Sequence, residues 1–159
     1  MKNSPFTQPP PPPVQVTAAL EPVRNLILTM WALTAQEPNI GDAWLNKATE
    51  QLSPEVERFN RLLVDAFGSL LLAQESYIDF PSYLAALSRL PTERFQAHVA
   101  EALSEIENGA LRSEAETVAS NPALLQQRLV DHVRSLWENQ LAAEWKRQTL
   151  MMNGMTRTL

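Results

Sequence analysis

The strongest structural signal in this sequence is the stretch LWENQLAAEWKRQ at residues 136–148. Its two tryptophans, Trp137 and Trp145, are eight positions apart. They therefore lie about 80° from each other on an α-helix, and one apolar stripe can include both. A tryptophan needs a partner for its indole N–H and a shaped space for its ring. Because Leu136 and Leu141 accompany them, the stretch predicts a helix that packs against another apolar surface.

Apolar residues recur at helical spacing along most of the chain that precedes this stretch, and prolines and small polar residues mark where helices begin. Five predicted helices run from Pro22 to Glu37-Pro38, from Asp42 to Gln51, from Ser53-Pro54 to Gly68 (which weakens or ends the helix), from Asp79-Phe80-Pro81 to Leu90, and from Pro91-Thr92 to Asn108-Gly109. A short sixth helix is predicted to begin at Ser113, because Glu116 stands three residues later in capping-box spacing. The last predicted helix runs from Asn121-Pro122 through Trp145 toward Met152. Their predicted inward stripes include Val23, Leu26, Ile27, Met30 and Trp31 in the first helix.

Two segments cannot be assigned to a helix or a strand from the sequence. Val14-Gln15-Val16 fits either a short strand or the start of the first helix, and Leu70 to Phe80 fits no single element. Signals for β-structure are otherwise nearly absent, with few β-branched runs and only four glycines. The sequence therefore predicts an all-α protein, a single compact domain of about six to eight helices.

The first residues differ from the rest. Six of the twelve prolines precede Val14, including the unbroken run Pro9 to Pro13, and such a tract adopts extended polyproline II. It could serve as a PxxP ligand, but no Arg or Lys flanks it closely, so a spacer is the better interpretation. We predict a disordered, proline-rich tail over residues 1–16 and a helical domain over residues 17–159.

Charge and composition exclude several classes. The net charge of -5 disfavours binding to a phosphate backbone, and we expect no nucleic-acid binding by this chain alone. The chain has no cysteine and hence no disulfide or thiolate metal site. The longest apolar stretches, Leu26 to Leu33 and Leu70 to Ala73, are shorter than the roughly 18 residues of a membrane helix. With no secretory signal at the start, we expect a cytoplasmic protein without membrane contact.

Candidate catalytic and metal-binding groups are sparse. His98, Glu101 and Glu105 have the spacing to converge on one helix, but the buried face of that helix is defined by Phe95 and its neighbours, which leaves both acids toward solvent. Asp131 and His132 are adjacent, so their side chains point about 100° apart and cannot act as a pair. We predict that His132 is a surface histidine, and we expect no metal, no cofactor and no enzymatic activity.

The aromatic residues are the remaining candidates for a functional site. At helical spacing they are usually core residues, yet a tryptophan-rich helical core can also enclose an apolar cavity for a small ligand. The candidate residues for a ligand pocket or an interface are Trp31, Trp137, Leu141 and Trp145. Near the end, Met151, Met152 and Met155 offer adaptable apolar surface for a neighbouring domain or subunit. Because the chain ends without a helix terminator beyond Gly154, we expect more protein to follow.

The segment LILTMWAL at residues 26–33 behind Val14-Gln15-Val16, together with the pattern Leu-Trp-Glu-x-x-x-Ala-x-Glu-Trp from residue 136, resembles a bacterial regulator architecture. It is similar to the N-terminal helical region of arsenical-resistance-repressor-like (ArsR-type) winged-helix transcriptional regulators, over roughly Val14 to Gln148. The resemblance implies an oligomerisation or effector-sensing role beside a DNA-binding domain. This chain departs from the family because it contains no winged helix and no cysteine metal ligands, so thiolate-based metal sensing is excluded.

Three functional hypotheses follow. The first is a non-catalytic accessory module of a bacterial transcriptional regulator, homodimeric, with an adjoining DNA-binding domain and an apolar small-molecule effector as further partners. The second is a free-standing helical domain that binds an apolar small molecule or peptide. An enzyme or metalloprotein acting through His98 ranks last.

Overall fold

The computed structural model of this chain describes residues 22–34, 43–71 and 77–155. Within these residues the chain forms eight α-helices and one π-helical turn, and no strand, which confirms the predicted all-α class. The elements are α1 (Pro22–Leu33), α2 (Ala43–Glu50), α3 (Pro54–Leu71), α4 (Phe80–Arg89), α5 (Thr92–Glu105), α6 (Gly109–Ala119), α7 (Pro122–Leu136), η1 (Trp137–Leu141) and α8 (Ala142–Met155). The predictions for the Pro9–Pro13 tract and for Val14-Gln15-Val16 lie outside the described residues.

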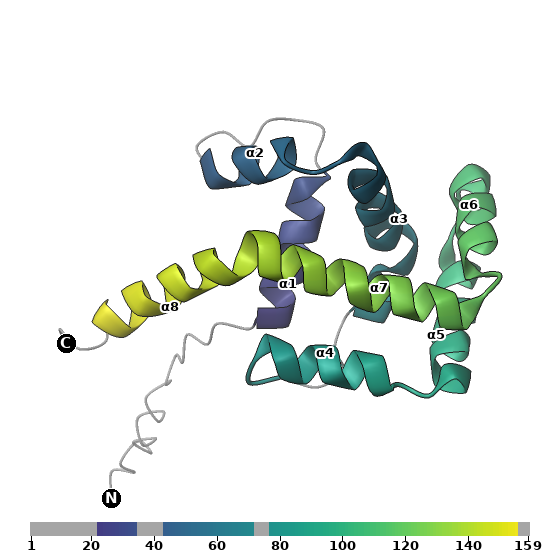
Figure 1. Cartoon of the computed structure of the whole chain (residues 1–159). Coiled ribbons are helices and arrows are strands. Elements are labelled where there is room, and N and C mark those ends of the chain that lie inside the picture. Colours follow the sequence, from purple (N-terminus) through teal and green to yellow (C-terminus); the bar gives the residue numbers. More distant parts are fainter. Residues whose placement is uncertain (1–21, 35–42, 72–76, 156–159) are drawn as a thin grey trace, which may run out of the picture.

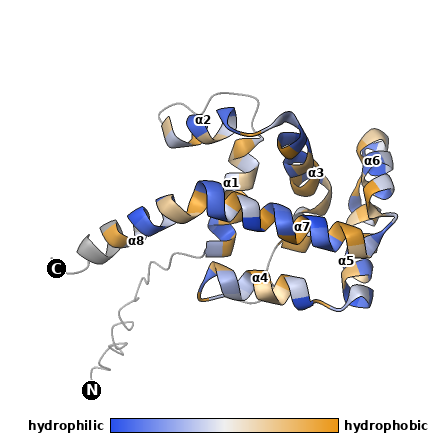
Figure 2. Cartoon of the chain, viewed as in Figure 1, coloured by the Kyte–Doolittle hydropathy of each residue, from blue (hydrophilic) through white to orange (hydrophobic). Residues whose placement is uncertain are grey.

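Helices α3 and α7 organise the core. Helix α3 packs against α1, α5, α6 and α7, while α7 also packs against α4 and α5. Figure 1 shows α4 running alongside α7, with α5 and α6 at the end of α7 that carries its first residues. Along α7, hydrophobic and hydrophilic residues alternate in bands (Figure 2), as expected for a helix with one buried face. The fully buried side chains of this core include Phe67, Phe95, Leu129 and Val133.

Side-chain caps begin several helices where the sequence predicts them. Asp79 accepts a hydrogen bond from the backbone N–H of Ser82 at 2.8 Å, and Asn121 accepts one from Leu124 at 3.1 Å. Each cap satisfies a backbone donor that has no partner inside the helix. These contacts confirm the predicted starts of α4 and α7.

One predicted helix start is wrong. Helix α6 begins at Gly109, because the side chain of Asn108 accepts hydrogen bonds from two backbone N–H groups of the first turn. Ser113 therefore lies inside α6 and does not start a helix. Gly68 was predicted to weaken or end its helix, and the structure shows the weaker effect: α3 kinks at Phe67 (φ -127°, ψ 20°) and continues to Leu71. Both Phe67 and Leu71 are fully buried, and their packing holds the last turn in place.

The first helix also differs from its predicted orientation. Its buried residues are Pro22, Val23, Leu26, Met30 and Leu33. Trp31 was expected on the inward stripe, but its side chain is 63% exposed. The reason is geometric: Met30 occupies the centre of the buried face, and the next residue on a helix is rotated by about 100°.

The last of the described residues form one long, interrupted helix. Helix α7, the π turn η1 and helix α8 follow each other without a loop. Helix α8 is in contact mainly with η1 and projects from the body, away from α5 and α6 (Figure 1). The side chains of Met151, Met152 and Met155 lie outside what the structure describes.

Candidate functional site: an aromatic cluster, an exposed helix face and a buried polar network

An aromatic cluster lies where α4 meets the π turn. The ring of Trp137 stacks on Phe80, with ring centroids 4.3 Å apart and ring planes 10° apart. Trp145 approaches Trp137 at 6.0 Å between centroids, and Tyr83 lies 6.0 Å from Phe80. Stacked and tilted rings at these distances contribute beyond the apolar area that they bury. The cluster therefore joins α8 to α4 through the side chain of Trp137.

The π turn brings the two tryptophans onto one side of the helix. The backbone N–H of Ala142 donates to the carbonyl of Trp137, five residues earlier, in place of the usual four. One extra residue in a turn rotates everything that follows by about 100°, which changes the angle between Trp137 and Trp145 from about 80° to about 20°. Leu141, on the same turn, is buried. The structure thus brings Trp137 and Trp145 together by a feature that the apolar spacing did not reveal.

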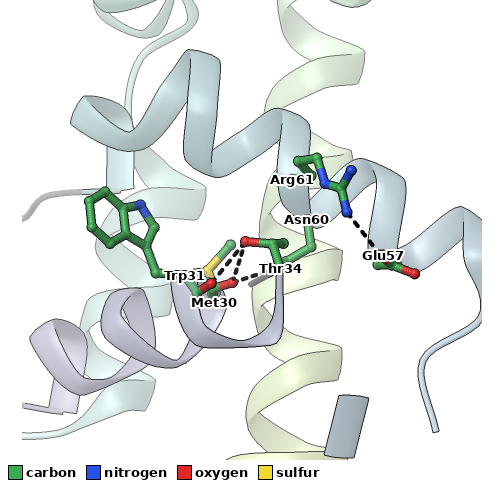
Figure 3. A network of polar contacts seen from close by, with 6 residues as sticks. All are labelled: Met30, Trp31, Thr34, Glu57, Asn60 and Arg61. Atoms are coloured by element: carbon green, nitrogen blue, oxygen red, sulfur yellow. Dashed lines mark hydrogen bonds and ion pairs between the residues drawn. The ribbon is translucent and has the colours of Figure 1, made fainter. Parts of the chain in front are cut away.

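Trp31, the fourth predicted site residue, lies elsewhere, on the outer face of α1. Arg24, Leu28 and Trp31 are all exposed and follow each other at spacings of four and three residues, which places them on one stripe. Leu28 is 55% exposed. In Figure 3 the indole of Trp31 points away from the polar contacts around Met30. Trp31 makes no ring contact with any described aromatic residue.

A polar network is buried between α1, α3 and α7. Asn60, which is fully buried, donates from Nδ2 to the carbonyl of Met30 at 2.8 Å (Figure 3). Its Oδ1 lies 3.0 Å from Nε2 of His132. Because Oδ1 can only accept, Nε2 of His132 carries the proton. The hydroxyl of Thr34 lies 3.4 Å from the same carbonyl and 2.9 Å from the carbonyl of Trp31, which is the closer acceptor for its one proton. One side chain thus links three helices.

The position of His132 corrects the prediction of a surface histidine, because its side chain is only 9% exposed. Its ring meets Phe59 edge-on at 5.2 Å between centroids. Burial lowers the pKa of His132 to about 4, and the nearby positive charge of Arg128 acts in the same direction. The imidazole is therefore neutral near pH 7 and serves as a hydrogen-bond donor within the core.

A signal for this network was present in the sequence. His132 follows Leu129 by three residues and precedes Leu136 by four, so it occupies a position on the apolar stripe of α7. Asn60 precedes Leu63 by three residues and Phe67 by seven, so it also lies on the apolar stripe of its helix, α3. A polar residue at a core position requires a partner, and each of these two supplies the other's.

The remaining titratable candidates have separate surroundings. Nδ1 of His98 lies 3.9 Å from the carboxylate of Glu101, and both Glu101 and Glu105 are exposed, as predicted. Asp131 pairs with Arg134 at 2.9 Å. Among the described residues, no three potential ligand side chains gather closely enough to hold a metal ion.

Two surface grooves are lined by described residues. One, of about 560 Å³, lies between α3, α6 and α7, and the other, of about 470 Å³, lies between α3, α5 and α6. Neither is lined by the four predicted site residues. Of the helices that the structure describes, none has both the length and the apolar character needed to cross a bilayer. No protein-family model, curated protein or solved structure matches this chain.

Proposed function

We propose that this chain is a non-catalytic helical module that associates with a second copy of itself through the outer face of α1. The observation that carries the proposal is the exposure of Trp31 and Leu28, at 63% and 55%, on a helix whose opposite face is already fully buried. The outer-face stripe is defined here as Arg24, Leu28 and Trp31.

The composition of α1 supports an interface on its outer side. The helix reads PVRNLILTMWAL, and Arg24 is its only charged residue. A helix that is apolar nearly all round is normally covered on every side. Tryptophan is enriched among the residues that dominate interface energetics, and it is costly to leave in water. A surface of this kind is typical of a docking site.

A second copy fits this stripe well. In a two-fold symmetric dimer the same patch faces itself. If two α1 helices cross antiparallel, Leu28 and Trp31 of each copy meet near the centre. The two Arg24 side chains then lie at opposite ends, about 16 Å apart along the helix axes. That separation exceeds the Debye length of about 8–10 Å at physiological salt, so the like charges do not oppose association.

The test is the mass of the chain in solution, measured by light scattering and sedimentation over a concentration series. We expect a dimer for the unaltered chain and a monomer for Trp31→Glu. Leu124→Glu is the matched control, because Leu124 is also exposed (51%) but lies on α7. It should remain dimeric, and far-UV circular dichroism should show unchanged helicity for both variants. A monomeric parent chain, or a Trp31→Glu variant that remains dimeric, would contradict the proposal.

A narrower proposal concerns the process that such a dimer serves. The sequence patterns at residues 26–33 and 136–148 support an accessory role in a bacterial transcriptional regulator of the ArsR-like kind. In that role the projecting helix α8 would connect the dimer to an adjoining DNA-binding domain. The test is the reading frame that encodes this chain: a winged-helix segment should follow the codon of Leu159, and a stop codon there would reject the connection.

A further inference from the structure

We propose that the groove between α3, α6 and α7 binds a small monocarboxylate with a flat, apolar body, and that Arg128 pairs with its carboxylate. The inference does not depend on dimer formation, since the groove and the outer-face stripe of α1 belong to different helices.

The groove has the size and the lining of a small-molecule site. Its volume of about 560 Å³ lies within the range of about 300–1,000 Å³ that ligand pockets occupy. Helix α3 contributes Phe59 and Leu62, and α6 contributes Val118. These side chains offer an apolar wall on which a planar ligand can pack. A few polar groups at fixed positions are then sufficient to orient it.

Arg128 is the group that determines the charge of the ligand. Its guanidinium carbon lies 4.4 Å from the centroid of the Phe59 ring, so a cation–π contact holds the head group at the groove. None of the described residues offers Arg128 a carboxylate or carbonyl partner, and its side chain faces solvent. A guanidinium carries five N–H donors in a planar fork that matches a carboxylate with two parallel hydrogen bonds.

The second arginine of the groove provides an internal contrast. Arg58 donates from Nε and Nη2 to one carboxylate oxygen of Glu114, at 3.0 and 2.7 Å. Its charge is already compensated. Removal of the Arg58–Glu114 pair as a whole should therefore change ligand binding far less than removal of Arg128.

The acidic residues restrict the charge of the ligand. Glu55 and Glu114 line the same groove, so a dianion such as phosphate would meet two carboxylates as well as two arginines. Since Arg58 pairs with Glu114, a ligand with a single negative charge pairs with Arg128, while Glu55 adds a like charge that disfavours a second negative charge on the ligand. The apolar wall gains contact area with a flat organic anion, whereas a small inorganic ion would lose hydration there without any apolar contact in return. A monocarboxylate with an aromatic body satisfies both conditions.

The experiment uses 2-naphthoate as the probe and isothermal titration calorimetry of the full chain as the measurement. We expect saturable binding of one naphthoate per chain. In Arg128→Met, which keeps the apolar stem over Phe59, affinity should fall about tenfold or more, the size of a lost charge-assisted hydrogen bond. The double variant Arg58→Met/Glu114→Gln removes both charges of the ion pair together; it is the matched control and should stay within about threefold of the parent chain. Arg128→Lys keeps the charge but loses the fork and should lie between the two.

Three results would overturn the proposal. One is the absence of saturable naphthoate binding to the parent chain. Another is an Arg128→Met variant with unchanged affinity and unchanged far-UV circular dichroism, which would move the binding site away from this groove. The third is equally tight binding of the neutral analogue 2-naphthylmethanol, or displacement of naphthoate by inorganic phosphate at equal concentration, because either would remove the selectivity for a monocarboxylate.

Discussion

The replacement of Asn60 by leucine tests whether the buried polar network holds α1, α3 and α7 together. Leucine has a similar volume, so the change removes hydrogen bonds with little change in packing. Two groups lose their partner: the carbonyl of Met30 and the Nε2–H of His132, at 2.8 and 3.0 Å from the Asn60 amide. A buried donor or acceptor without a partner costs about 1–3 kcal/mol.

Neither group has a full replacement for the lost hydrogen bond, and this sets the expected magnitude. The hydroxyl of Thr34 lies 3.4 Å from the carbonyl of Met30, but its one proton has a closer acceptor in the carbonyl of Trp31 at 2.9 Å, and Nε2 of His132 is left with an apolar neighbour. We therefore expect Asn60→Leu to lower the free energy of unfolding by about 2–4 kcal/mol at pH 7. That is a large part of the roughly 5–15 kcal/mol that a typical domain has.

Urea denaturation followed by circular dichroism measures the effect. Asn139→Leu serves as the matched control: Asn139 is exposed, it hydrogen-bonds to the exposed Ser135, and its replacement should cost no more than about 0.5 kcal/mol. The double variant Asn60→Leu/His132→Leu removes both polar partners, so its cost should be smaller than the sum of the two single costs by about 1 kcal/mol or more. An Asn60→Leu variant as stable as the control, or a double variant whose costs simply add, would refute the reasoning.

Two further outcomes follow from the same structure. Because burial lowers the pKa of His132 to about 4, the unfolded chain takes up a proton near pH 6.5 and the folded chain does not until about pH 4. As the pH is lowered from about 6.5 to about 4, the free energy of unfolding should therefore fall by about 1.4 kcal/mol per pH unit relative to the His132→Gln variant. Parallel pH profiles of the two proteins in urea denaturation would contradict this. Trp137→Ala removes the ring that stacks on Phe80 at 4.3 Å and should cost about 2–3 kcal/mol in thermal or urea denaturation, because the side chain is only half-buried. Trp31→Ala is its control and should stay within about 0.5 kcal/mol under conditions where the chain is monomeric; equal losses for the two would be the contrary result.

Local signals in the sequence were sufficient to predict much of the fold. Asp79 and Asn121 each precede a proline and a helical stripe, and both cap the expected helix. Such signals act within four residues, so no knowledge of the remaining chain is needed. The prediction failed at Ser113 because Asn108, five residues earlier, caps the same helix and begins it first.

The candidate site was predicted less well, because its contacts join distant residues. Asn60 and His132 are 72 positions apart, and only the packing of α3 against α7 brings them within 3.0 Å. Adjacency in the chain relates His132 only to Asp131, whereas its hydrogen-bond partner Asn60 lies across the core. The inward stripe predicted from helical spacing included Trp31, although the buried set Val23, Leu26, Met30 and Leu33 leaves it on the other side of the helix.

The π turn was not predictable from apolar spacing, since a stripe with a period of 3.6 residues assumes an unbroken ladder of four-residue hydrogen bonds. Trp137 and Trp145 were correctly expected on one stripe, and the structure brings them closer in angle than an ideal α-helix would. The stacking partner Phe80 lies 57 positions before Trp137, beyond the reach of any local pattern.

The π turn η1 also determines the directions in which the side chains of α8 point. The azimuth of every side chain in α8, including the exposed Leu150, depends on whether the segment 137–141 contains five residues or four. Deletion of one residue there would leave α7 seated in the body and swing the outer faces of the terminal helix by about 100°. The same deletion would restore an angle of about 80° between Trp137 and Trp145 and shift the buried Leu141, so the direction of the projecting helix and the aromatic contact at its base are set together by one residue.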